Sequence, residues 1–303
     1  MMRALVTGAR GFLGSQMIDR LLSEGHEVIA ASRTATESDR EGLSWIRYPA
    51  RVGDWVGALD GVGTVYHFAW STTPSTSNER PIDDAIENVV PSIALLEALR
   101  VQKARLIFAS SGGTVYGATS AVKVRENSPT SPISAYGVSK LAVENYVNFY
   151  SKVYGVEATC LRISNPYGPG QPGDKSFGAV ATFARAALRG EPIKIFGDGT
   201  IVRDYLYVDD LITAILLAGK ADAPVSTLNI GSGEGTSLNE IIEGLQEFLA
   251  QRLVVEYFPQ RKFDVPVSIL DIELARNSLG WSPLTRFPDG LAKTLEGMQS
   301  HRR

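Results

Sequence analysis

The chain has 303 residues, of which 44% are hydrophobic and 21% charged, a composition typical of a globular protein with a sizeable core. Its net charge of −3 provides no basic field, so neither nucleic acid nor an anionic membrane is expected as a partner. One cysteine and three histidines cannot build a disulfide framework and argue against a structural zinc site, so no metal is expected.

The N-terminal half alternates strand-like apolar runs with segments of helical periodicity. Strand-like runs are predicted at residues 3–7, 27–31, 64–68, 105–109 and 158–162. Apolar residues recur at helical spacing over residues 14–24 and 84–100. Continuous apolar strands separated by helices predict a parallel sheet covered on both faces, a doubly wound α/β fold of the Rossmann type.

After about residue 165 the loops become richer in glycine and proline. Helices are predicted at about 208–219, 237–250 and 271–279, and short strands alternate with them less regularly. We therefore expect residues 1–165 to form the Rossmann domain, with the chain partly returning to it around 200–230. Residues 166–303 are expected to form mainly a smaller α/β lobe that binds the substrate.

The stretch VTGARGFLG, residues 6–14, follows the first strand and opens the first helix. Its glycines Gly8, Gly11 and Gly14 permit a tight turn, close approach of a pyrophosphate, and close packing of helix on strand. The free N–H groups at the start of the helix then face the phosphates. The loop, with Phe12 and Leu13 inside it, predicts a dinucleotide-binding site.

The end of the second strand bears on the choice of dinucleotide. Ser32 and Arg33 stand where an acidic residue would bind the ribose hydroxyl of NAD, and no acidic residue follows until Glu37. A hydroxyl and a guanidinium suit a phosphate better, which favours NADP over NAD. Alternatively, Arg33 is only a surface residue and another loop distinguishes NAD from NADP.

Tyr136 and Lys140 lie four residues apart at the predicted start of a helix, so both side chains point the same way. An ammonium beside a phenol, together with the positive charge of an oxidised nicotinamide, favours the phenolate and lowers its pKa toward neutrality. The pair predicts a base that can take a proton from a sugar hydroxyl.

Together these motifs resemble the extended short-chain dehydrogenase/reductases, and within them the NAD-dependent epimerase/dehydratase family that acts on nucleotide sugars. The resemblance covers nearly the whole chain. Further motifs that recur in this order are HFA at 67–69, SSGGTVYG at 110–117, RISNPYGP at 162–169, IFGDGTIVRDYLYVDDL at 195–211 and RKFDVP at 261–266.

The resemblance implies a role for each matching residue. Tyr136 would be the catalytic acid and base, and Lys140 would bind the nicotinamide ribose and lower the tyrosine pKa. Further cofactor contacts would come from Phe68, Ala69, Asn88 and Ser110. Substrate contacts would come from Asn165, Arg203, Arg261 and Asp264.

Two departures from the family pattern concern the stretch at 110–117 and the loop at 69–78. Many members carry a Ser or Thr where this chain has Gly112, so the hydroxyl that bridges to the sugar would come from Ser111 or Thr114, with Thr114 slightly favoured. Dehydratases carry an acidic pair where this chain has Gly113 and Thr114, which disfavours dehydration. The loop at 69–78, AWSTTPSTSN, resembles epimerase-like sequences whose substrate is less certain.

The resemblance implies a nucleotide-sugar 4-epimerase, most simply for a UDP-linked sugar, that passes through a 4-keto sugar. An NADPH-dependent 4-keto-sugar reductase and a non-catalytic dinucleotide sensor are the alternatives. Family members pair through the helices at about 84–100 and 136–154, which predicts a homodimer, although the apolar stripes there could equally face the protein's own sheet. The first apolar run, residues 4–6, is too short for a signal peptide and no stretch approaches a membrane span, so a cytoplasmic location is expected.

Overall fold

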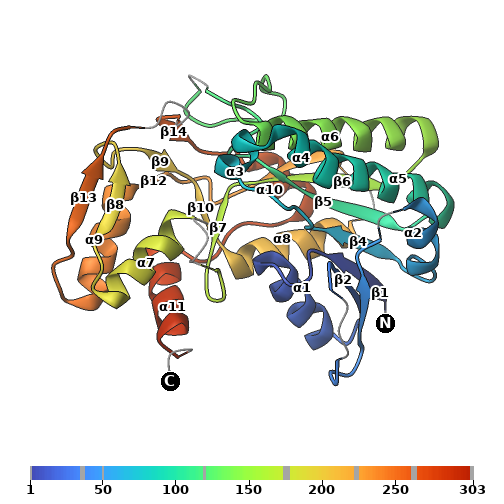
Figure 1. Cartoon of the computed structure of the whole chain (residues 1–303), viewed down its shortest axis with the longest axis horizontal. Helices are drawn as coiled ribbons and strands as arrows, with labels where there is room; N and C mark the ends of the chain where they lie inside the picture. Colours follow the sequence, from blue (N-terminus) through green and yellow to red (C-terminus); the bar gives the residue numbers. More distant parts are fainter. Residues whose placement is uncertain are drawn as a thin grey trace.

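The computed structural model describes residues 2–34, 38–49, 51–118, 121–172, 178–221, 225–260 and 265–300. Within these residues the chain forms a large lobe around a central sheet and a smaller lobe beside it (Figure 1). Of the residues singled out above, Glu37, Arg261 and Asp264 lie outside the described ranges.

The described residues of the large lobe form a seven-stranded parallel sheet in the order β11-β6-β5-β4-β1-β2-β3. Its strands are β1 (Arg3–Thr7), β2 (Glu27–Ser32), β3 (Leu43–Arg47), β4 (Thr64–His67), β5 (Arg105–Ser111), β6 (Ala158–Ile163) and β11 (Thr227–Ile230). From β1 the strands are added toward one edge of the sheet, through β2 to β3, and from β4 toward the other edge. This change in the order of the strands is the topology of a doubly wound fold. The predicted fold class is thus confirmed.

The two edge strands are the ones that the sequence does not reveal. No residue of β3 is fully buried, so its apolar pattern is weak, and β11 is short and carries a polar Asn229. The five predicted strands occupy the interior of the sheet, where both faces are covered and the residues read as continuous apolar runs.

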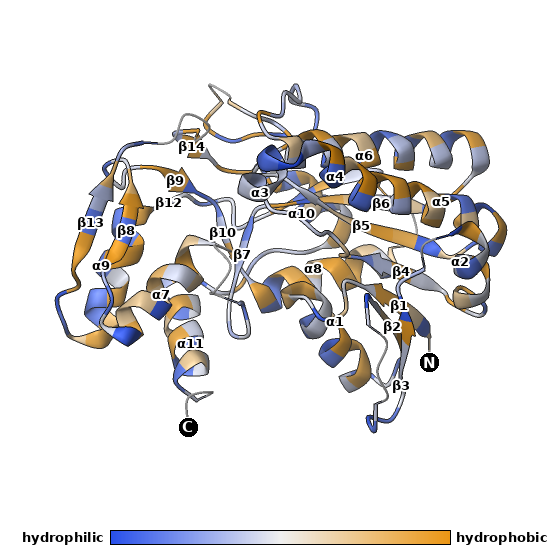
Figure 2. Cartoon of the chain, viewed as in Figure 1, coloured by the Kyte–Doolittle hydropathy of each residue, from blue (hydrophilic) through white to orange (hydrophobic). Residues whose placement is uncertain are grey.

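Helices cover both faces of the sheet (Figure 1). Ala4 and Val6 of β1 pack on one side with α1 (Phe12–Ser23) and α8 (Val208–Lys220), whereas Leu5 packs on the other side. The second side is covered by α2 (Val52–Ala58), α5 (Val90–Gln102) and α6 (Ala135–Tyr154). Figure 2 shows the result, since the central strands and the inner faces of these helices are mostly hydrophobic.

The segment before α5 is irregular. It runs through α3 (Pro74–Glu79), α4 (Pro81–Asp84) and a π-helical turn (Ala85–Val89), and then continues directly into α5. The helix predicted at 84–100 is therefore present, but its first turn is a π turn, a feature that is frequent at functional sites.

The smaller lobe is built from short strands and three helices among the described residues. Parallel pairs join β7 (Asn165–Tyr167) to β10 (Tyr205–Tyr207) and β8 (Ile193–Phe196) to β13 (Val255–Phe258). A third sheet joins β9 (Val202–Arg203) to β12 (Thr236–Ser237) and β14 (Val267–Ser268). The helices of this lobe are α7 (Ala179–Arg189), α9 (Leu238–Leu249) and α11 (Phe287–Ser300), whereas α10 (Glu273–Leu279) packs on α8 and β11 of the large lobe.

The chain passes between the lobes more than once. After β10 it returns to the large lobe, where α8 packs against the sheet and β11 pairs with β6, and then it crosses back to form α9. The smaller lobe has its own apolar core, to which α7, α9 and α11 contribute. Among the described helices, none is both long enough and apolar enough to cross a membrane.

Candidate active site

A cavity of about 580 Å³ lies where β1, β4, β5 and β6 end and the smaller lobe begins. This edge of an open α/β sheet is the usual place for ligands. Predicted site residues that line the cavity are Gly8, Gly11, Phe12, Leu13, Gly14, Phe68, Ser110, Ser111, Thr114, Tyr136, Lys140, Asn165 and Arg203. Residues more than 190 positions apart in the sequence are thus brought to one space.

Four predicted cofactor residues lie outside the described lining of this cavity: Ser32, Arg33, Ala69 and Asn88. The Ser32 hydroxyl donates to the carbonyl of Thr34, and Arg33 is exposed at the end of β2. Asn88 is buried in the π turn, where its side-chain oxygen accepts from the backbone N–H of Ser71 at 2.8 Å. Asn88 therefore holds the loop after β4 in place rather than facing the cavity.

The glycine loop is shaped by contacts that exclude side chains. Gly8 has φ of +63°, and a Cβ there would lie 2.8 Å from the backbone nitrogen of Ala69. A Cβ on Gly14 would lie 2.2 Å from the Gly8 carbonyl oxygen, so α1 could not pack so closely on the loop. Gly11 precedes α1 without a side-chain cap, which leaves the first N–H groups of the helix available. This arrangement fits the pyrophosphate of a dinucleotide.

A buried hydrogen-bond network fixes the loop that follows β4. The Thr7 hydroxyl oxygen accepts from the backbone N–H groups of Phe68 and Ala69, both at 3.1 Å. Its proton is therefore directed to Nδ1 of His67, 2.8 Å away, and Nε2 of His67 donates to Ser92 at 3.0 Å. Burial lowers the pKa of His67 to about 3, so the ring is neutral and serves as a structural link.

Tyr136 and Lys140 lie at the start of α6. Ser134 caps this helix, since its hydroxyl accepts from the Gly137 N–H at 3.2 Å, and the Tyr136 N–H donates to Ser77 at 3.0 Å. The Lys140 ammonium lies one turn further on and donates to the Ala109 carbonyl at 2.7 Å. Its nitrogen is 5.6 Å from the centre of the Tyr136 ring.

The protein's own groups shift the pKa values of this pair in specific directions. Burial raises the pKa of Tyr136, and the nearby charge of Asp84 adds to the effect. Burial lowers the pKa of Lys140 to about 7, against the opposing attraction of Asp84 and Glu144. The lowered tyrosine pKa that the sequence predicts is thus not produced by these groups, and it stays a prediction for a site that holds an oxidised nicotinamide.

The strand end at 110–117 has no room for a side chain at Gly112. A Cβ there would lie 2.6 Å from Cδ1 of Leu270 and 3.0 Å from the carbonyl oxygen of Arg162. Ser111 is half-buried and lines the cavity, whereas the Thr114 hydroxyl is buried, also at the cavity, and makes no hydrogen bond within the described residues. Both hydroxyls thus remain candidates for the one missing at Gly112.

The hydroxyl of Ser110 has a different partner from the expected one. It donates to the carboxylate of Glu144, which also forms a buried ion pair with Arg162 at 2.7 Å. Arg162 in turn donates to the Tyr116 hydroxyl at 2.9 Å. Ser110 therefore ties the end of β5 to α6 and β6, although it also borders the cavity.

Substrate residues predicted in the described ranges lie on the side of the smaller lobe. The Asn165 side chain donates to the carbonyl of Asp204 at 2.9 Å, and Arg203 donates to the carbonyl of Val265 at 2.7 Å. The Asp204 carboxylate is buried and accepts the N–H groups of Ser232, Gly233 and Leu270. Burial nonetheless raises the pKa of Asp204 above its ordinary value.

Three residues of the site were not predicted from the sequence: Trp70, Asp84 and Glu144. Trp70 lines the cavity, and its ring lies 3.6 Å from the Lys140 ammonium nitrogen. The fully buried carboxylate of Asp84 accepts from the hydroxyls of Thr72 and Ser139. Glu144 follows Lys140 by one helical turn, a spacing that could have revealed it, whereas the other two contacts join separate elements and leave no local pattern.

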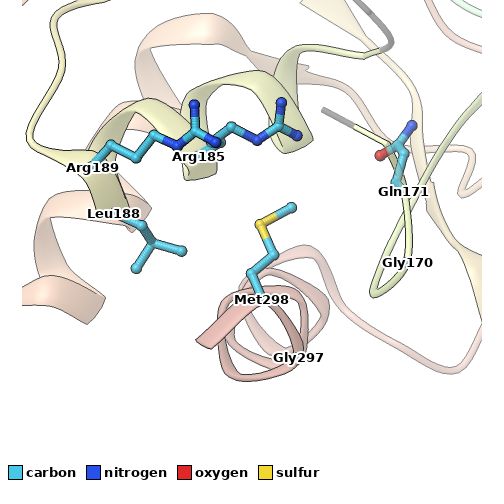
Figure 3. A pocket seen from close by; sticks show the side chains of 7 residues that line it. All are labelled: Gly170, Gln171, Arg185, Leu188, Arg189, Gly297 and Met298. Carbon is cyan, nitrogen blue, oxygen red and sulfur yellow. The ribbon is translucent and has the colours of Figure 1, made fainter. Parts of the chain in front are cut away.

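A second, smaller cavity of about 220 Å³ lies between α7 and α11 (Figure 3). Arg185 and Arg189 of α7 extend over Met298 of α11, and Gln171 stands at the opposite end. Gln171 also borders the large cavity, but no residue predicted for catalysis or binding lines the small one. Across the described residues, no cluster of three or more His, Cys, Asp or Glu side chains could hold a metal ion.

Comparison with known proteins agrees with this geometry. Residues 4–231 match the model of the NAD dependent epimerase/dehydratase family. The chain is similar to the UDP-glucose 4-epimerase of Mycolicibacterium smegmatis, with 35% identity over 306 residues that cover 97% of this chain and 98% of the relative.

The chain is also similar to solved structures of UDP-glucose 4-epimerases. The UDP-glucose 4-epimerase of Thermotoga maritima, determined with UDP-glucose, has a TM-score of 0.91 and 34% identity and covers 100% of both chains. The UDP-glucose 4-epimerase of Thermus thermophilus, in complex with NAD, has a TM-score of 0.89 and 32% identity and covers 98% of this chain and 99% of its own.

Proposed function

Because the chain belongs to the NAD-dependent epimerase/dehydratase family, as its motifs predict, we propose that it is a nucleotide-sugar 4-epimerase with a UDP-linked hexose as substrate. One observation carries the proposal: a single cavity is lined by the glycine loop, by Tyr136 and by Lys140, and no acidic residue stands at Gly113 or Thr114. The similarity to UDP-glucose 4-epimerases over the whole chain supports the same reaction.

The dinucleotide would lie along the glycine loop. Gly8, Gly11 and Gly14 would admit its pyrophosphate, with the N–H groups at the start of α1 directed at the phosphates. Phe68 and Ala69 are held by Thr7 at the edge of this space and would border the cofactor. A nicotinamide held there would supply reversible hydride transfer at C4 of the sugar.

Tyr136 would take the proton of the 4-hydroxyl group and give it back after the 4-keto sugar has turned over. Lys140 would keep a positive charge near the phenol and the nicotinamide ribose, which opposes the raised pKa that burial gives to Tyr136. Thr114 or Ser111 would hydrogen-bond the reacting oxygen, and Thr114 is favoured because its buried hydroxyl has no partner within the described residues.

The nucleotide-sugar end would be held by the smaller lobe. Asn165 and Arg203 border the cavity from β7 and β9, and a planar guanidinium suits a diphosphate. Arg261 and Asp264 lie outside the described residues and stay predictions for the diphosphate and the nucleoside ribose. Residues 1–165, joined by α8 and β11, would then bind the dinucleotide, and most of 166–303 the nucleotide sugar.

We propose NAD as the cofactor, since the family is NAD-dependent and the Thermus thermophilus relative was solved with NAD. The preference for NADP that Ser32 and Arg33 suggest stays a prediction. Affinities for both dinucleotides, measured by calorimetry on the wild type and on Arg33→Ala, decide between them. An unchanged NADP affinity in Arg33→Ala would remove the basis for that preference.

The test of function is the conversion of UDP-glucose to UDP-galactose without added reductant, followed by chromatography. Tyr136→Phe should lower kcat by about a thousandfold, because the acid–base group is removed. Thr114→Val should lose more turnover than Ser111→Ala. Arg185→Ala, in the smaller cavity, is a matched control that should keep the wild-type rate.

Other outcomes would point to other functions. Stoichiometric consumption of NADPH with a nucleotide 4-keto sugar would indicate a reductase, and mass spectrometry of the dinucleotide released from the purified protein gives an independent answer. Binding of dinucleotide without any turnover, with Tyr136→Phe indistinguishable from wild type, would indicate a sensor. The cytoplasmic location stays a prediction.

We also propose a homodimer formed through α5 and α6. The apolar stripes predicted at 84–100 and 136–154 do not all face the sheet. Val143 and Val147 are buried and Ile93 is half-buried, whereas Ile86 of the π turn, Val90 of α5 and Tyr146 of α6 are exposed. Further exposed apolar residues are Ile82 in α4 and Val138, Phe149 and Val153 in α6. An apolar surface of this kind, shared by two neighbouring helices, is typical of an interface between subunits.

A further inference from the structure

The Lys140 ammonium is surrounded by aromatic rings. Its nitrogen lies 3.6 Å from the centre of the Trp70 ring, 5.0 Å from that of Phe108 and 5.6 Å from that of Tyr136. An ammonium over an indole face is attracted by the negative electrostatic potential of the ring, and the attraction grows when water is excluded. Lys140 is only 3% exposed, so little water screens this attraction.

The usual partner of a buried ammonium, a carboxylate, is not in contact with Lys140 in the described structure. The two nearest carboxylates are already engaged by other donors: Glu144 by Ser110 and Arg162, and Asp84 by Thr72 and Ser139. Lys140 donates a hydrogen bond to the Ala109 carbonyl at 2.7 Å. The face of Trp70 is therefore the principal side-chain contact that holds this charge.

Trp70 also contacts the other member of the catalytic pair. Its ring meets the edge of Tyr136 with centroids 5.8 Å apart and an interplanar angle of 69°, and it packs on Phe108 at 6.2 Å. The indole N–H is buried and makes no hydrogen bond within the described residues. Ring packing alone thus orients Trp70, and the same ring contacts both Lys140 and Tyr136 at the wall of the cavity.

We propose that Trp70 is a positioning residue of this active site, whose ring face fixes the Lys140 ammonium beside Tyr136. This inference rests on the proposed function for its catalytic consequence, but the placement itself can be tested without activity. We assign the positioning role of Trp70 to its ring face, since the indole N–H makes no hydrogen bond within the described residues. A phenyl ring should therefore replace it in part, and an aliphatic side chain should not.

The kinetic test compares Trp70→Leu with Trp70→Phe in the conversion of UDP-glucose. In Trp70→Leu, kcat should fall by about ten- to a hundredfold, while KM stays within about threefold, because the lost contact acts on the acid–base pair and not on substrate affinity. Trp70→Phe should recover kcat to within about fivefold of wild type, since the ring face is retained.

Trp55 supplies the matched control. It is a fully buried tryptophan in the core, and its indole N–H is likewise without a hydrogen bond in the described residues. Trp55→Leu and Trp55→Phe should lower the melting temperature but leave kcat and KM near the wild-type values. The Trp55 variants therefore show the effect of losing a large buried ring in general, and the Trp70 variants show the effect of losing the ring beside Lys140.

The second measurement is the NMR spectrum of protein carrying 13C at the ε position of lysine, with the Lys140 signal assigned by its absence in Lys140→Arg. Ring current from Trp70 should shift the Lys140 ε protons upfield in the wild type. The shift should be lost in Trp70→Leu, retained in part in Trp70→Phe, and unchanged in both Trp55 variants.

Three results would overturn the proposal: a kcat of Trp70→Leu within about threefold of wild type, a rise in KM alone, or equal losses in Trp70→Leu and Trp70→Phe. Absence of the upfield shift in the wild type would also overturn it. If the wild type converts no nucleotide sugar, the proposed function fails, and the NMR measurement still decides whether Trp70 holds Lys140.

Discussion

Gly112 shows how one residue can be fixed by its surroundings. The position faces Leu270 on one side and the Arg162 carbonyl on the other, so even a Cβ atom is too close to both. Its neighbour Gly113 has nothing within 4 Å of the place where a Cβ would be. Two adjacent glycines in the same turn thus differ in their tolerance of a side chain.

We therefore expect Gly112→Ser to destabilise the protein by about 1–3 kcal/mol, because the added atoms force Leu270 or the backbone to move. Gly113→Ser is the matched control and should change the stability by less than about 0.5 kcal/mol. Urea unfolding at neutral pH measures both. If the two variants are equally stable, the Leu270 side chain can move aside without lowering the free energy of unfolding.

His67 predicts a specific response to acid. Its pKa is about 3 in the folded protein and near 6.5 when exposed, because burial disfavours the imidazolium. Between these pH values the unfolded chain binds more protons, so the free energy of unfolding decreases as the pH falls from 6.5 toward 3.

The prediction is tested by the difference in the free energy of unfolding between about pH 7 and about pH 4.5, which lie on either side of the exposed imidazole's pKa. This difference should be smaller in His67→Gln than in the wild type, since the titrating group is gone. His26→Gln retains the buried imidazole and should keep the wild-type difference. If the wild type, His67→Gln and His26→Gln lose the same free energy of unfolding between these pH values, groups other than His67 cause the acid sensitivity.

At the scale of elements, Asp84 joins three segments that the sequence keeps apart. Its carboxylate ends α4 and accepts from Thr72 in the loop after β4, from Ser139 in α6 and from Asn88 in the π turn. It also lies close enough to Tyr136 and Lys140 to raise the pKa of both. The π turn is therefore held by the same carboxylate that adjusts the charge of the active site.

Asp84→Asn should lower the free energy of unfolding by about 2 kcal/mol or more, because an amide donor replaces an oxygen that now accepts from buried donors. Asp83→Asn removes the neighbouring carboxylate, which is exposed and 3.8 Å from Arg80, and should cost less than about 0.5 kcal/mol. Chemical denaturation of both variants provides the measurement. If Asp84→Asn is as stable as the wild type, the network tolerates an amide NH2 donor in place of the accepting carboxylate oxygen.

At the scale of the whole molecule, the exposed apolar residues on α5 and α6 predict the oligomeric state. Val90→Glu places a charge in the middle of the proposed interface and should convert the dimer to a monomer. Val254→Glu, at an equally exposed position in the smaller lobe, should leave the dimer intact. Light scattering coupled to size exclusion gives the masses, and a monomeric wild type would refute the interface.

Much of the fold and part of the site could be predicted from the sequence. The five interior strands, the glycine loop and the helix that carries Tyr136 and Lys140 are each indicated by a local pattern. Edge strands β3 and β11 are not, because β3 is partly exposed and the polar Asn229 interrupts the apolar residues of β11. The contact of Asn88 with Ser71 could not be predicted either, because it depends on how the π turn packs.

The sequence by itself determined the features that depend on neighbours along the chain. The turn at Gly8 and the shared face of Tyr136 and Lys140 follow from backbone conformation and helical spacing over a few residues. Only the tertiary structure decided that Trp70 lies over Lys140 and that Leu270 closes the space at Gly112. These contacts join residues from separate elements, and they form only when the sheet order and the packing of the two lobes bring those elements together.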